Sequence, residues 1–99
     1  MTTTPIPPDH PGEILADDLS ELQISQSQLA RALGVPRSRI NQIVLGRRSM
    51  EADTALRLAR FFGTSDRYWL NLRARYDLEV TKDALGDALA KVEPLRTAS

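Results

Sequence analysis

The sequence predicts an all-α fold of five or six short helices. Apolar residues recur at helical spacing in successive segments, and glycine or proline separates most of these segments. No segment alternates apolar and polar residues as a half-buried strand does. The chain has 99 residues, of which 41% are hydrophobic and 26% charged, so it is long enough to form one domain with a core.

A first helix is predicted at about residues 11–22. Pro11 suits the first helical position, because the N–H that proline lacks would have no partner within the helix there. Glu13 suits the first turn, where the helix dipole is positive. The residues expected to face inward are Ile14, Leu15, Leu19 and Leu22. Residues 1–9, rich in threonine and proline, are predicted to form a flexible arm before this helix.

The second helix carries the clearest start and stop signals in the chain. Ser25 and Gln28 form an S-x-x-Q capping box, and Ile24 and Leu29 are spaced as a hydrophobic staple. Gly34 ends the helix, because glycine readily takes the left-handed conformation wanted there. The residues expected to face the core are Leu29, Ala30 and Leu33.

A third helix follows at once, from about Arg37 to Leu45, with Pro36 at or just before its first position and Gly46 as its stop. One face is apolar and holds Ile40, Ile43 and Val44. At 100° per residue the opposite face is free of acidic residues. This outward face consists of Ser38, Asn41, Gln42 and Leu45, with Arg37 and Arg39 on its flanks.

Three further helical segments are predicted. The first covers residues 52–62 and ends at Gly63, and the second follows a cap at Ser65 and carries Trp69, Leu72 and Tyr76 on one stripe. The last covers residues 80–92, contains Gly86 and stops before Pro94. Its apolar stripe must be buried, either against the same chain or against a second subunit. The domain is therefore expected to cover residues 10–93, followed by a flexible tail at 94–99.

Charge is distributed unevenly, although the formal net charge is zero. Residues 1–30 carry a net −5, residues 31–75 a net +7 and residues 76–99 a net −2. The segment from Arg31 to Arg48 holds five arginines and no acid. This middle part either presents a basic surface to a nucleic acid or forms an ordinary solvated face.

Two short helices joined by a glycine turn match the helix-turn-helix, whose second helix lies in the major groove of duplex DNA. Asn41 and Gln42 can each bond adenine, Arg37 or Arg39 can bond guanine in a fork, and Ser38 can serve either base. Gln26 is expected near a phosphate, and Arg47 and Arg48 are placed to neutralise phosphates. The alternative is a plain helical hairpin. The cap, the turn and the acid-free face together favour DNA binding over that alternative.

The sequence resembles the lambda-repressor-like, Xre-type helix-turn-helix family and, more narrowly, the HigA-type antitoxins, also known as VapI-like antidotes. The motifs that carry the resemblance are Gln28-Leu29-Ala30, Leu33-Gly34-Val35, Gly46-Arg47-Arg48-Ser49, the stretches 10–15 (HPGEIL) and 52–65, Trp69-Leu70-Asn71-Leu72 and Tyr76-Asp77-Leu78. The match covers about residues 10–80. Two positions depart from the family pattern. Pro36 stands where Ser or Thr is common, and Leu45 stands where Asn is common. An outward Leu45 either touches a thymine methyl group or packs, and we expect it to pack.

The resemblance implies a homodimer that represses its own operon and neutralises a small basic toxin, a RelE-like mRNA-cleaving protein. By family position, it implies DNA contacts from Gln26, Arg37, Ser38 and Gln42. The competing hypothesis is a stand-alone repressor without a toxin partner. Independently of the resemblance, helix-turn-helix proteins commonly bind two half-sites as dimers, so a homodimer is expected.

The sequence lacks the residues that metal-binding proteins, enzymes and membrane proteins require. The chain has no cysteine and one histidine, His10, which falls at a predicted helix cap, so no metal site or cofactor is expected. No nucleophile with a base and no phosphate loop is apparent, so no enzymatic activity is expected. No secretory signal or membrane span is apparent, so the protein is expected in the cytoplasm.

Two groups of residues allow more than one interpretation. The acidic residues of the first helix form a solvated face, a catalytic pair or a contact for a basic toxin. These residues are Glu13, Asp17, Asp18 and Glu21. Trp69 and Tyr76 are expected to be core or dimer anchors rather than platforms for stacked bases.

Overall fold

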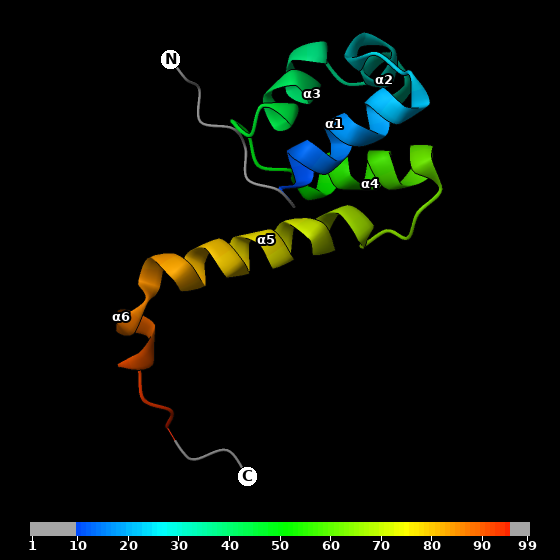
Figure 1. Cartoon of the computed structure of the whole chain (residues 1–99). Helices are drawn as coiled ribbons and strands as arrows, with labels where there is room; N and C mark the ends of the chain where they lie inside the picture. Colours follow the sequence, from blue (N-terminus) through cyan, green and yellow to red (C-terminus); the bar gives the residue numbers. More distant parts are fainter. Residues whose placement is uncertain (1–9, 96–99) are drawn as a thin grey trace, which may run out of the picture.

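The computed structural model describes residues 10–95, and these residues form six helices without a strand. The helices are α1 (Pro11–Leu22), α2 (Gln26–Leu33), α3 (Arg37–Val44), α4 (Ala52–Phe62), α5 (Tyr68–Leu85) and α6 (Asp87–Ala90). Helices α1 to α4 pack into one cluster, and α5 runs beneath them before it projects away (Figure 1). The all-α prediction of five or six helices is therefore confirmed. The predicted arm at residues 1–9 and residues 96–99 of the predicted tail lie outside the described part.

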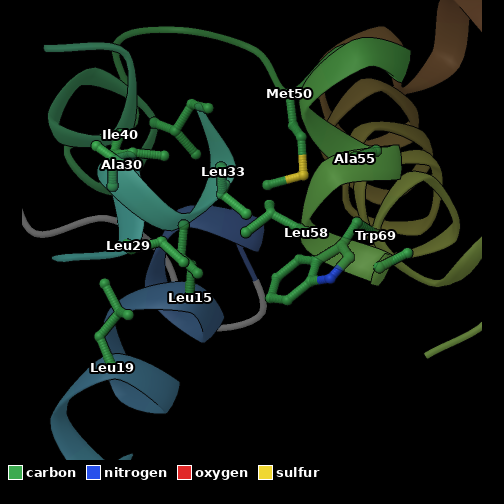
Figure 2. Close-up of a cluster of buried hydrophobic side chains, with 12 residues drawn as sticks. Leu15, Leu19, Leu29, Ala30, Leu33, Ile40, Met50, Ala55, Leu58 and Trp69 are labelled. Carbon is green, nitrogen blue, oxygen red and sulfur yellow. The ribbon is translucent and has the colours of Figure 1, made fainter. Parts of the chain in front are cut away.

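The core lies between α1 to α4 and the first turns of α5. Its largest fully buried side chains are Trp69, Leu15, Leu29, Ile40, Ile43 and Leu58. Figure 2 shows the Trp69 ring from α5 beside Leu58 and Met50. Trp69 is thus a core anchor, as expected. Most of these residues belong to the inward stripes that helical periodicity predicts.

Helix α1 approaches α3 closely at Gly12. A Cβ atom added to this glycine would clash with the main-chain carbonyl oxygen of Ile43 near the end of α3. His10 caps α1, because its Nδ1 accepts a hydrogen bond of 2.9 Å from the Gly12 N–H. The start of α1 therefore positions the end of α3.

The C-terminal helices differ from the prediction in two ways. Helix α5 begins at Tyr68 without a side-chain cap, so the predicted cap at Ser65 is wrong. The predicted fifth helix and the first part of the predicted last helix form one continuous helix of 18 residues. The reason is local: no glycine or proline lies between Tyr76 and Val80, so nothing interrupts the helix there. The break comes at Gly86, which has a positive φ of 49°.

The end of α5 and all of α6 do not fold back onto the domain. Every residue from Asp77 to Leu95 is exposed, including Leu85 at 43%, Leu89 at 44% and Val92 at 70%. Figure 1 shows this segment reaching away from the helix cluster. Of the two alternatives for the apolar stripe of residues 80–92, burial against the same chain is not what the structure shows.

Candidate nucleic-acid interface

The turn between α2 and α3 is fixed by local hydrogen bonds. At the start of α2 the Gln28 N–H donates to Ser25 Oγ at 3.0 Å, and the Ser25 N–H donates to Gln28 Oε1 at 2.8 Å. At its end Gly34 has a φ of 75° and donates its N–H to the Ala30 carbonyl at 2.9 Å. The predicted capping box and glycine stop are both confirmed. Three residues separate the end of α2 from the start of α3, with Pro36 at the N-cap position of α3.

Helix α3 presents a polar, acid-free outer face. Ile40 and Ile43 are fully buried and fix the rotation of the helix about its axis. Arg37, Ser38 and Gln42 are exposed. Leu45 is 45% exposed, so residues 10–95 of the same chain do not bury it. The face thus offers hydrogen-bonding groups and one apolar side chain, which is the chemistry that base edges in a major groove require.

Gln26 and Asn41 are joined across the two helices. Asn41 Nδ2 donates to Gln26 Oε1 at 3.1 Å, and both residues are half-buried. This contact links the first residue of α2 to the middle of α3. Gln26 therefore lies beside the outer face of α3, close to the residues with which it was predicted to act.

Arg39 points in a different direction from its neighbours on α3. Its Nη1 lies 3.3 Å from Asp53 Oδ1, in the first turn of α4, and its side chain is 26% exposed. The same Asp53 oxygen accepts from Arg57 Nε at 2.8 Å, and Arg57 Nη1 donates to the Leu33 carbonyl at 2.7 Å. The structure therefore places Arg39 against α4 and away from the group that contains Ser38 and Gln42.

Arg47 and Arg48 lie in the loop that leaves α3, and both are exposed. The backbone at the start of the loop and the core contact at its end fix the position of the loop. Gly46 has a φ of 75°, and Met50, which is 2% exposed, anchors its far end in the core. Arg73 of α5 donates from Nη1 to the Met50 carbonyl at 2.9 Å. Two cations are thus held just beyond the recognition face.

Sequence reasoning missed Asp53, Arg57 and Arg73 as supports of this surface. The i, i+4 spacing of Asp53 and Arg57 on one helix was a readable signal for their ion pair. The contacts of Asp53 with Arg39, and of Arg73 with Met50, join residues 14 and 23 positions apart. Residues so far apart in the sequence form no local motif, so the sequence alone does not predict these two contacts.

Among residues 10–95, the pKa values of His10 and Asp18 are shifted. Burial lowers the pKa of His10, while the charges of Asp77 and Glu13 act in the opposite direction. The His10 ring also meets the Tyr76 ring edge-on, with centroids 4.8 Å apart. Burial raises the pKa of Asp18, and the nearby Glu21 and Asp17 add to that effect. Within residues 10–95, no group of three or more acidic, histidine or cysteine residues is arranged to hold a metal ion.

No helix in the described part of the chain is both long and apolar enough to span a membrane.

Comparisons with known proteins agree with this geometry. Residues 19–69 match the family described as Helix-turn-helix. Virulence-associated protein I of Dichelobacter nodosus is 47% identical over 78 residues, which cover 78% of this chain and 72% of that protein.

Solved structures also match almost the whole chain. An addiction module antidote protein of a HigA family from Coxiella burnetii is 46% identical, with a TM-score of 0.82, covering 93% of this chain and 99% of that chain. The Pseudomonas aeruginosa antitoxin HigA, solved with the higBA promoter, is 44% identical, with a TM-score of 0.80, covering 94% and 100%. The resemblance inferred from the sequence motifs is confirmed. This chain belongs to the HigA antitoxin family of helix-turn-helix proteins.

Proposed function

We propose that this chain is a sequence-specific DNA-binding antitoxin that represses its own operon as a dimer and neutralises a RelE/HigB-like mRNA-cleaving toxin. One observation carries the DNA-binding part. The helix-turn-helix presents an exposed, acid-free face on α3, and two exposed arginines, Arg47 and Arg48, follow it. The relative from Pseudomonas aeruginosa was solved with promoter DNA, which supports the same role here.

In the proposed complex, α3 lies in the major groove. Gln42 and Asn41 bond adenine edges, Arg37 bonds guanine, and Ser38 bonds either base. Gln26 holds Asn41 in place and reaches a phosphate, while Arg47 and Arg48 neutralise phosphates on the flank of the groove. The bound protein blocks RNA polymerase sterically in the cytoplasm, and no reaction is catalysed.

The proposed dimer uses the projecting end of α5 and α6. This segment exposes large apolar side chains that the chain itself leaves uncovered. Two copies related by a two-fold axis would bury these side chains and present two α3 helices to two half-sites. Helix-turn-helix dimers place these half-sites about 34–36 Å apart along the duplex.

The antitoxin part rests on membership of the HigA family, and its test is co-expression. The open reading frame adjacent to this gene is expected to encode a small basic protein that arrests growth when expressed alone. Co-expression of the present chain should restore growth, and the two proteins should co-purify.

A harmless neighbour, or one that does not bind, would contradict the antitoxin role. It would favour the second candidate, a stand-alone Xre-type repressor. The observation behind that candidate is that both helices of the helix-turn-helix, α2 and α3, belong to this chain.

A further inference from the structure

Asp53 lies at the centre of a small charge network that connects three helices. Its Oδ1 accepts from Arg57 Nε at 2.8 Å within α4 and lies 3.3 Å from Arg39 Nη1 on α3. Arg57 in turn donates to the Leu33 carbonyl at the end of α2. The network therefore spans the helix-turn-helix on the side that faces α4.

Arg39 is drawn inward by this network. Its side chain is 26% exposed, and its Nε is buried with no hydrogen-bond partner among residues 10–95. A buried donor without a partner is unfavourable. The rest of the side chain must therefore be held in place, and the contact of Nη1 with Asp53 is the polar interaction that holds it.

The rotation of α3 about its axis places Arg39 at the border of the outer face. Buried Ile40 and Ile43 define the inner face, and Arg39 lies between that face and exposed Gln42. A residue on this flank is within reach of the phosphates that border the groove. A free guanidinium there would bind the backbone of any duplex, because phosphate contacts carry no sequence information.

We propose that Asp53 is a specificity-determining positioning residue, which holds Arg39 against α4 so that α3 reads bases without an additional nonspecific phosphate contact. This inference rests on the proposed function, since it requires α3 to enter the groove. The Asp53 side chain is 60% exposed, and exposed ion pairs contribute little to folding stability. Asp53 therefore mainly determines where the positive charge of Arg39 lies, and it contributes little to the free energy of unfolding.

The test compares Asp53→Asn with the wild-type protein on operator DNA and on shuffled duplex, across a range of salt concentrations. In Asp53→Asn, Arg39 is released. Binding to shuffled duplex should rise several-fold at low salt, and the slope of log K against log salt should steepen by about one. Operator binding should rise less, so the ratio of operator to shuffled affinity should fall.

Three further variants make the test specific. Asp53→Asn combined with Arg39→Ala should return shuffled-duplex binding to the wild-type level, because the released cation is gone. Asp53→Glu keeps the charge and should keep the wild-type ratio. Asp66→Asn removes the same charge from an exposed position in the turn between α4 and α5 and should leave the ratio unchanged. Thermal midpoints establish that each variant is folded.

The inference is overturned if Asp53→Asn leaves shuffled-duplex binding unchanged, or if Asp66→Asn raises it equally. It is also overturned if the double variant keeps the increase. A wild-type protein that binds operator and shuffled duplex equally contradicts the proposed function itself and removes this inference with it. That result is read from the wild type alone, so the two failures are distinguishable.

Discussion

Gln42 and Arg48 occupy different places on the surface, so their truncation should change DNA binding in different ways. Gln42 is exposed in the middle of the acid-free face of α3, whereas Arg48 is exposed in the loop beyond it. An amide can satisfy both a donor and an acceptor on one adenine, which makes Gln42 a base reader. A guanidinium at the edge of the groove bonds phosphates, which are the same in every sequence.

Gln42→Ala should therefore weaken operator binding by about 1–3 kcal/mol and relax specificity at one base pair. Arg48→Ala should weaken binding to operator and shuffled duplex alike and reduce the salt slope by about one. Titrations of both duplexes by fluorescence anisotropy measure these effects, with Arg75→Ala on α5 as the arginine control. Equal losses on both duplexes for Gln42→Ala would remove it from the reading role.

His10 links stability to pH through the cap of α1. Burial lowers its pKa below the ordinary value of 6.5, so the folded protein takes up the proton less readily than the unfolded chain. Well above pH 6.5 His10 is neutral in both the folded and the unfolded state, and the cap contributes fully. As the pH falls from 6.5 toward the lowered pKa, the unfolded chain binds more protons and the free energy of unfolding decreases.

His10→Asn should remove this pH dependence, because asparagine caps a helix without titrating near neutrality. Chemical denaturation at pH 7.5 and at pH 5 measures the free energy of unfolding of both proteins. The decrease on acidification should be larger for the wild type. Asp18, whose raised pKa acts in the opposite sense at lower pH, is common to both proteins and cancels in the comparison. Parallel decreases would show that His10 is not responsible.

At the scale of helices, the sequence predicted the bounds of those helices that have clear start or stop residues. It did not predict the bounds of α5, where such residues are missing. Helices α2 and α4 match their predicted spans because capping and glycine stops are properties of neighbouring residues. Periodicity in the sequence divided α5 into two helices before Val80, although no glycine or proline lies there to interrupt the helix. The outer face of α3 followed from its period, but the orientation of Arg39 depends on Asp53, which packing alone brings near.

Gly12 lies where α1 approaches the main chain of α3. Alanine is intrinsically better than glycine inside a helix by about 1 kcal/mol. Here the added Cβ would clash with the Ile43 carbonyl oxygen, which is main chain and cannot rotate away.

We expect Gly12→Ala to lower the free energy of unfolding by about 1–3 kcal/mol, as overpacking does. Operator affinity should also fall, because α3 must shift. Urea denaturation and operator titration test both effects, and Ser20→Ala, an exposed position on the same helix, is the control. A Gly12→Ala protein as stable as the wild type would contradict the close packing of α1 on α3.

At the scale of the whole molecule, residues 10–95 form a packed helix cluster and a projecting segment that exposes several large apolar side chains. Leu78 and Leu85 are 60% and 43% exposed and lie seven residues apart, on one face of α5. Neither belongs to the core, so changing them should leave the cluster folded. Their exposure is explained if a second copy covers them.

The double change Leu78→Asp and Leu85→Asp should yield a folded monomer, because it places charges in the proposed dimer contact. Sedimentation should show the wild type as a dimer and the variant as a monomer at the same concentration. Operator affinity should fall by about 10²-fold or more, since two linked reading heads bind far more tightly than one. Leu56→Asp, at a leucine that is 50% exposed on α4, should stay dimeric. A variant that remains dimeric would place the interface elsewhere.

A chain that reads one DNA sequence through α3 must bind its own operator more tightly than other DNA of the same composition. Wild-type protein is titrated at physiological salt onto the DNA upstream of its own operon and onto a shuffled duplex of equal length and composition. We expect an affinity for the operon DNA at least about 10³-fold higher than for the shuffled duplex. Equal affinities with equal salt slopes would mean that the basic surface binds phosphates only, and would contradict the assignment of α3 as a recognition helix.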